Sequence, residues 1–156
     1  MKTKGLLLAL TVCFITGALW SADNPQIGTW KLNEAKSKLA AGVAKVGTVI
    51  YEAAGDKIKV TVEATDSNGN ATKTEWIGNF DGKAYEVTGG AEPSTRAYKM
   101  VNDRTLTFVE KSKGKVTVSG RIVVAPDGMT RTVTSTSTDA KGMKVRSTAL
   151  YDKQQM

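Results

Sequence analysis

Residues 115–124 read KVTVSGRIVV, and residues 57–64 read KIKVTVEA. Both stretches alternate apolar and polar side chains. In the first, the apolar face holds Val116, Val118, Ile122 and Val124, opposite Thr117, Ser119 and Arg121. A repeat of two residues indicates a β-strand with one buried face and one solvent-facing face. These two stretches therefore favour an all-β fold.

The same alternation extends along the chain and is interrupted by turn residues. Clusters such as 66–70 (DSNGN) and 126–128 (PDG) recur roughly every 9 to 14 residues, the spacing of an antiparallel meander. The pattern predicts about ten strands, near 27–32, 46–54, 57–65, 71–80, 83–88, 95–101, 104–112, 115–125, 129–138 and 143–151.

Only residues 33–39 (NEAKSKL) indicate helix, as one short turn after the first strand with Asn33 as its N-cap. The absence of a long amphipathic segment excludes helical bundles and doubly wound α/β folds. Residues 23–156 are expected to form a single domain.

A meander of this length would leave two unpaired edges if it stayed open. Pairing of the first strand with the last removes both edges. We therefore expect an antiparallel up-and-down barrel of about 8–10 strands. A two-layer sandwich is the alternative.

The first 22 residues have the order of a secretory signal peptide. Lys2 and Lys4 precede the apolar run 5–20 (GLLLALTVCFITGALW), and small residues follow at Ser21 and Ala22. This predicts export to a periplasm or to the medium, with no membrane-spanning segment left after cleavage. A weaker alternative is a lipid anchor on Cys13.

Composition restricts the chemistry. The chain has no histidine, and its single cysteine, Cys13, lies in the leader. Imidazole bases, thiol nucleophiles and Cys/His metal sites are therefore excluded, and neither a cofactor, a metal nor an enzymatic activity is expected. The weaker alternative is an enzyme whose chemistry uses neither histidine nor cysteine. Beyond the leader, 20 basic and 15 acidic residues leave a net charge of +5, spread along the chain. Nucleic-acid binding would need a concentrated basic stripe, so at most a weak contact with anionic envelope surfaces is expected.

The first expected strand contains Gly28-Thr29-Trp30. It resembles the opening strand of the calycins, the lipocalins and intracellular lipid-binding proteins, in which a Gly-x-Trp plugs the closed end of the barrel. The resemblance implies a calycin-like barrel and an arginine near the C-terminus packed on Trp30. Arg146 is the candidate. The central Thr-Asp-Tyr motif of lipocalins and the Arg-x-Tyr of fatty-acid-binding proteins are absent.

Alternation of side chains predicts which residues face the interior. Those proposed to bind a ligand are Arg96, Tyr98, Met100, Arg131, Trp76, Phe80, Tyr85 and Phe108, and Tyr151 is also expected to point inward. The alternative is a core filled by these side chains, without a cavity.

Two inward arginines require an explanation because a buried guanidinium is costly without an anion. For Arg96 and Arg131 the partner is an internal carboxylate, with Glu110 and Glu52 as candidates, or the anionic group of a ligand. A solvated barrel mouth is the third possibility.

The sequence thus predicts an exported, lipocalin-like protein that binds a small hydrophobic or amphipathic molecule inside its barrel. The alternative is a non-enzymatic structural or interaction module of the cell envelope with a filled barrel.

Overall fold

The computed structural model describes residues 24–155, so the predicted leader and Cys13 lie outside the described residues. The described chain forms ten strands and no helix. The strands are β1 (Gly28–Lys38), β2 (Lys45–Ala54), β3 (Lys57–Thr65), β4 (Ala71–Gly78), β5 (Asp81–Thr88), β6 (Ser94–Asn102), β7 (Thr105–Ser112), β8 (Lys115–Val124), β9 (Thr130–Thr138) and β10 (Lys144–Lys153). Apart from the end of β1, their bounds lie within two residues of the predicted ones.

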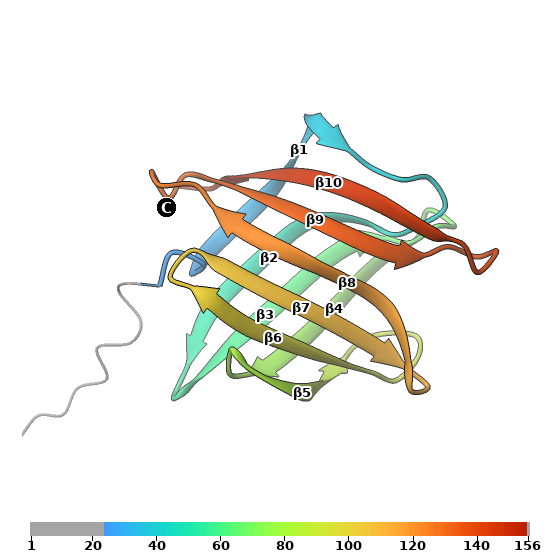
Figure 1. The fold of residues 1–156 in the computed structure, drawn as a ribbon, viewed down its shortest axis with the longest axis horizontal. Helices are drawn as coiled ribbons and strands as arrows, with labels where there is room; N and C mark the ends of the chain where they lie inside the picture. Colours follow the sequence, from blue (N-terminus) through green and yellow to red (C-terminus); the bar gives the residue numbers. More distant parts are fainter. Residues whose placement is uncertain (1–23, 156) are drawn as a thin grey trace, which may run out of the picture.

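The ten strands form one closed antiparallel barrel, in which each strand pairs with its neighbours in the sequence (Figure 1). The last strand returns to the first, with Trp30 opposite Lys153 and Leu32 opposite Tyr151. The predicted closed barrel is therefore confirmed, and the sandwich alternative is wrong. Closure is favoured because it leaves no strand with unpaired backbone groups along an edge.

The predicted helical turn at 33–39 is wrong, because β1 continues to Lys38. Asn33 does accept a hydrogen bond from the Lys36 amide, as a helix N-cap would (3.3 Å). The segment instead bulges away from the regular ladder opposite β10, between the pairs Asn33–Leu150 and Lys38–Thr148. There the Ser37 hydroxyl donates to the Asn33 carbonyl and accepts from the Leu150 amide. Pairing with β10 prevails here because a helix would leave the amides of β10 without acceptors.

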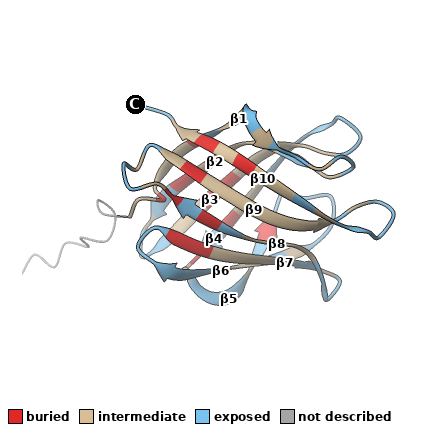
Figure 2. Cartoon of the chain, turned by 45° about the horizontal axis from the view of Figure 1, so that its top comes forward, coloured by how far each residue is buried: buried red, intermediate tan, exposed pale blue. Residues whose placement is uncertain are grey.

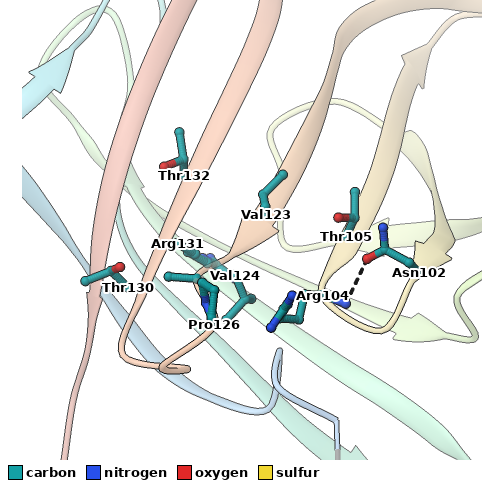
Figure 3. A pocket seen from close by; sticks show the side chains of 10 residues that line it. Asn102, Arg104, Thr105, Val123, Val124, Pro126, Thr130, Arg131 and Thr132 are labelled. Carbon is teal, nitrogen blue, oxygen red and sulfur yellow. Dashed lines mark hydrogen bonds between the residues drawn. The ribbon is translucent and has the colours of Figure 1, made fainter.

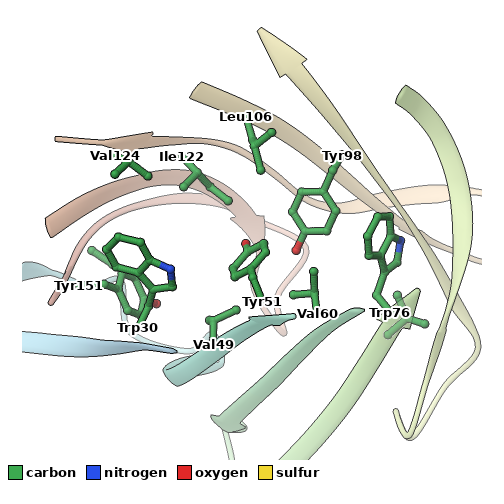
Figure 4. Close-up of a cluster of buried hydrophobic side chains, with 12 residues drawn as sticks. Trp30, Val49, Tyr51, Val60, Trp76, Tyr98, Leu106, Ile122, Val124 and Tyr151 are labelled. Atoms are coloured by element: carbon green, nitrogen blue, oxygen red, sulfur yellow. The ribbon is translucent and has the colours of Figure 1, made fainter. Parts of the chain in front are cut away.

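Most buried residues lie toward the end of the barrel opposite the β9–β10 loop, whereas the loops and much of β5 are exposed (Figure 2). Trp30 has no exposed surface, and its indole N–H donates to the Gln26 carbonyl at 2.9 Å. The buried apolar residues are Trp30, Val49, Tyr51, Val60, Trp76, Val87, Tyr98, Leu106, Ile122, Val124, Ala149 and Tyr151. Most of them face one another in Figure 4.

The barrel wall has one weakly paired seam, between β4 and β5. These strands pair only at Glu75–Thr88 and Trp76–Val87, whereas β9 and β10 pair along their whole length. The Trp76 indole reaches past β5 and donates to the Arg96 carbonyl of β6 at 2.8 Å. A side chain thus reinforces the wall where the backbone ladder is short.

Gly120 lies where β8 passes closest to its neighbours. A Cβ atom at this position would stand 2.5 Å from the Thr134 carbonyl oxygen and 2.7 Å from the Phe108 ring. Only glycine allows this approach, and Phe108 occupies the space that a side chain would take.

We expect Gly120→Ala to lower the free energy of unfolding by about 1–3 kcal/mol, because the added methyl group overlaps backbone that cannot move aside. Urea denaturation followed by tryptophan fluorescence measures the change. Gly47→Ala is the matched control, since the nearest atom to its added Cβ is at 3.9 Å. Equal stability of the two variants would contradict this account of the packing.

Candidate functional site

The barrel contains a cavity of about 640 Å³. Its mouth lies among the β1–β2, β3–β4 and β9–β10 loops, which contribute residues 39–40, 42–44, 66–67 and 139–140 to the lining. The volume is within the range of small-molecule sites, roughly 300–1,000 Å³. The interior is therefore not filled by its own side chains.

The lining changes from polar to apolar with depth. On the parts of the strands nearest the mouth it includes hydroxyl side chains, namely those of Thr72, Thr74, Ser135, Ser137 and Ser147. Further in, the cavity is bounded by Val49, Tyr51, Val62, Tyr98, Phe108, Ile122, Val133, Ala149 and Tyr151. A molecule reaching the base would therefore exchange water for mostly apolar and aromatic surface.

At the base of the cavity, Arg131 is surrounded by three aromatic rings. Its Cζ atom lies 4.8 Å from the ring centroid of Trp30, 4.9 Å from that of Tyr51 and 5.1 Å from that of Tyr151. These rings come from β1, β2 and β10, and Tyr151 is directly opposite Arg131 in the β9–β10 register. Each ring face attracts the guanidinium by about 0.5–2 kcal/mol.

The rings do not replace hydrogen-bond acceptors for this cation. Arg131 is 2% exposed, and its Nε and Nη1 atoms have no hydrogen-bond partner among the described residues. No carboxylate in residues 24–155 forms a salt bridge with it. Lys153 lies over the same indole, and burial together with the charge of Arg131 lowers the pKa of its ammonium group.

Arg96, higher in the cavity wall, has the partners that Arg131 lacks. Its guanidinium forms a salt bridge with Glu110 on β7 and donates to the Tyr98 hydroxyl at 3.2 Å. Burial by itself would lower the pKa of Arg96, and Tyr98 and Glu110 together raise it above the ordinary value. Of the two internal arginines, only Arg96 is thus neutralised by the protein.

Burial also affects the phenols near the base. It raises the pKa of Tyr51 well above the ordinary value, with Tyr98 acting in the same direction and Arg131 opposing. It raises the pKa of Tyr151 to about 12, again against the effect of Arg131. The Tyr151 hydroxyl donates to the Val46 carbonyl at 3.0 Å. Both phenols are therefore neutral hydrogen-bond donors at physiological pH.

Four of the eight side chains proposed for ligand binding line the cavity: Arg96, Tyr98, Phe108 and Arg131. Another three, Trp76, Phe80 and Tyr85, lie together beside it. The Trp76 ring stacks on Phe80 with ring centroids 6.2 Å apart and meets Tyr85 edge-on with centroids 5.5 Å apart. Met100 is opposite Leu106 in the register but is 43% exposed near the end of β6, so its expected place in the interior is wrong.

The expected partner of Trp30 also differs. Arg146 is exposed on β10, because its neighbours Val145 and Ser147 take the inward positions. Arg131 lies over the indole instead. Arg146 therefore does not pack at the closed end, and a residue from the preceding strand does.

Tyr51 was not among the predicted inward residues, because a register shift in β2 changes which side chains point inward. Glu52, the proposed partner of an inward arginine, is exposed, whereas Val49 and Tyr51 are buried. A bulge between Val46 and Thr48 reverses the alternation at the start of β2. The sequence does contain a signal for this arrangement, since Val49 and Tyr51 are apolar residues two positions apart. In the β1–β2 register they lie opposite Trp30 and Gly28.

A second hollow of about 360 Å³ lies outside the base of the barrel (Figure 3). Arg104 and Thr130 are among the side chains around it, and Asn102 accepts a hydrogen bond from the Arg104 amide at 3.1 Å. Val124 and Arg131, from the base of the barrel, also line this hollow, but its volume is little more than half that of the internal cavity. The internal cavity is therefore the stronger candidate site.

Comparisons of the chain with protein-family models and with curated proteins return no match. Within residues 24–155, no helix is long and apolar enough to cross a membrane. In the same range, no group of three or more potential side-chain ligands could hold a metal ion. Inference about function therefore depends on the cavity and its charged groups.

The Arg96–Glu110 pair provides a test of the electrostatics. Glu110→Leu leaves the Arg96 guanidinium buried and unpaired, so we expect a loss of about 2–4 kcal/mol in the free energy of unfolding. The double variant Arg96→Met/Glu110→Leu removes both charges and should recover at least about half of that loss. Urea denaturation of the two single variants and the double variant measures the coupling. Additive losses would show that the ion pair contributes nothing.

The raised phenol pKa values predict a pH dependence. In unfolded protein, tyrosines ionise near pH 10, whereas Tyr51 and Tyr151 in the barrel retain their protons to higher pH. The unfolded state therefore binds fewer protons between about pH 10 and 12, and the free energy of unfolding falls as pH rises through this window. Absorbance at 295 nm should show fewer phenolates at pH 11 in native protein than in urea. Identical titration curves would contradict the burial of these phenols.

Proposed function

We propose that this protein binds a small, mostly apolar molecule in the interior of its barrel. The supporting observation is the cavity of about 640 Å³, whose deeper walls are apolar and aromatic. A filled barrel acting as an envelope module is the other candidate, but it would require side chains to occupy this space. The role we propose is binding and not catalysis, since Glu110 is held by Arg96, and the other two carboxylates of the lining, Asp66 and Asp139, accept hydrogen bonds from backbone amides of their own turns.

We propose further that the protein is an exported member of the calycin-like barrels. Support for export is the order of charged, apolar and small residues in positions 1–22. Support for the calycin assignment is Gly28-x-Trp30 on the first strand of a closed barrel, with an arginine over the indole. In this chain that arginine comes from β9 and also lines the cavity.

Binding is tested with N-phenyl-1-naphthylamine, an uncharged probe that fluoresces in apolar surroundings. We expect saturable binding by the native protein, because the probe exchanges water for apolar surface. Ala149→Phe, which puts a ring into the cavity, should weaken binding at least about tenfold.

The matched control is Leu150→Phe, which adds an aromatic ring at the next position of β10, on the outer side of the wall. This variant should bind the probe like the native protein. Failure of the folded native protein to bind would favour the filled-barrel alternative. Equal affinity of both variants would place the probe outside the cavity.

A further inference from the structure

We propose that Arg131 is the anion-recognition group of the cavity, so that the ligand is an amphiphile with one negative charge that inserts its anionic end first. This inference rests on the proposed function and specifies the class of ligand. The anionic group would lie deepest in the cavity, and Arg131 would bind it.

The Arg131 guanidinium is buried with two of its nitrogen atoms lacking a hydrogen-bond acceptor within residues 24–155. The side chain is 2% exposed and lines the cavity, and its Nε and Nη1 atoms have no acceptor among the described residues. Trp30, Tyr51 and Tyr151 meet the cation with ring faces, and the Tyr51 hydroxyl also lies near it. The rings attract the charge but leave Nε and Nη1 without an acceptor in the described part of the chain. A carboxylate or sulfonate would supply both the charge and the acceptors.

The other charged side chains of the lining are either paired or lie at the mouth. Glu110 neutralises Arg96, and at the mouth Lys45 pairs with Glu34. Asp66 and Asp139 are occupied by backbone amides of their own turns. The two carboxylates keep their charges at the solvent-facing mouth. Among the described charged side chains that line the cavity, Arg131 is thus the one that is enclosed without an opposite charge beside it. A ligand with a single negative charge balances it, whereas a dianion would leave a charge buried without a partner.

The charge of Arg131 lies at the base of the cavity, beneath apolar walls. Between Arg131 and the hydroxyl-lined region near the mouth, the lining is formed by side chains such as Ile122, Val133 and Phe108. An anion at Arg131 would therefore have an apolar body packed against these walls. The neutral phenol of Tyr51, whose pKa responds to Arg131, lies at the same depth and can donate to the anion.

The test compares three probes with the same ten-carbon chain: decanoate, decane-1-sulfonate and 1-decanol. Their affinities are measured by displacement of N-phenyl-1-naphthylamine at pH 7.5. We expect native protein to bind decanoate at least about tenfold more tightly than 1-decanol. A similar preference for the sulfonate would indicate recognition of charge, and preference for decanoate alone would indicate recognition of carboxylate geometry. Either result supports the inference.

In Arg131→Met the preference for decanoate over 1-decanol should fall below about threefold, while 1-decanol continues to bind. Arg146→Met is the matched control, because it removes the same charge from an exposed arginine of the barrel wall that lines neither the cavity nor the second hollow. This variant should retain the native preference. Loss of the preference in both variants would assign it to the overall charge of the protein and overturn the inference.

The possible failures can be distinguished. If native protein binds 1-decanol and decanoate equally, the inference is wrong and the proposed function stands. If neither compound nor the naphthylamine probe binds, the proposed function itself fails. If Arg131→Met does not fold, the native protein still decides: decanoate should lose its advantage over 1-decanol as pH falls through the pKa of the fatty acid, and decane-1-sulfonate should keep it.

Discussion

The pairing of β1 with β10 is the constraint on which the rest of the structure depends. It converts a meander with two open edges into a closed wall, and it places Trp30 beside the end of the last strand. The same closure brings Tyr51, Tyr151 and Arg131 from three strands to one depth. Without it, a large indole and a guanidinium would have no common enclosure, and the chain would expose strand edges that pair readily with other molecules.

The two internal arginines show how position in one barrel changes what a charged side chain does. Arg96 has a carboxylate on the adjacent strand, since Glu110 is its direct cross-strand neighbour. Such a pair fixes the alignment of β6 with β7 and leaves little charge to act at a distance. The cross-strand neighbour of Arg131 on β10 is Tyr151, and on β8 it is Val124. The electrostatic difference between them follows from which residues the register places opposite each arginine.

Local patterns predicted the strands and several of the inward residues. Period-two alternation and turn residues located all ten strands, and alternation alone placed Arg96, Tyr98, Phe108 and Arg131 on the inner face. What failed depended on pairing between distant strands. The bulge that turns Tyr51 inward in place of Glu52 is set by the fit of β2 to its neighbours, and the residue that covers Trp30 is set by the β9–β10 register.

The size of the cavity is a further property that local patterns do not determine. It depends on how ten sets of inward side chains fill a common volume, and glycine at 120 is part of that balance because it lets Phe108 lie against the wall. A sequence identifies each inward side chain but not the space left when all of them are in place. For the same reason, an open interior and a filled one were equally compatible with the pattern.

The seam between β4 and β5 gives the enclosure an uneven rigidity. Most of the wall is fastened by long backbone ladders, but these two strands share only the positions at Glu75 and Trp76. Few ladder bonds need to break for the strands to separate there, so the barrel is most easily widened at this line. The barrel can thus widen where β4 and β5 separate, while β9 and β10, on the other side of the cavity, stay paired.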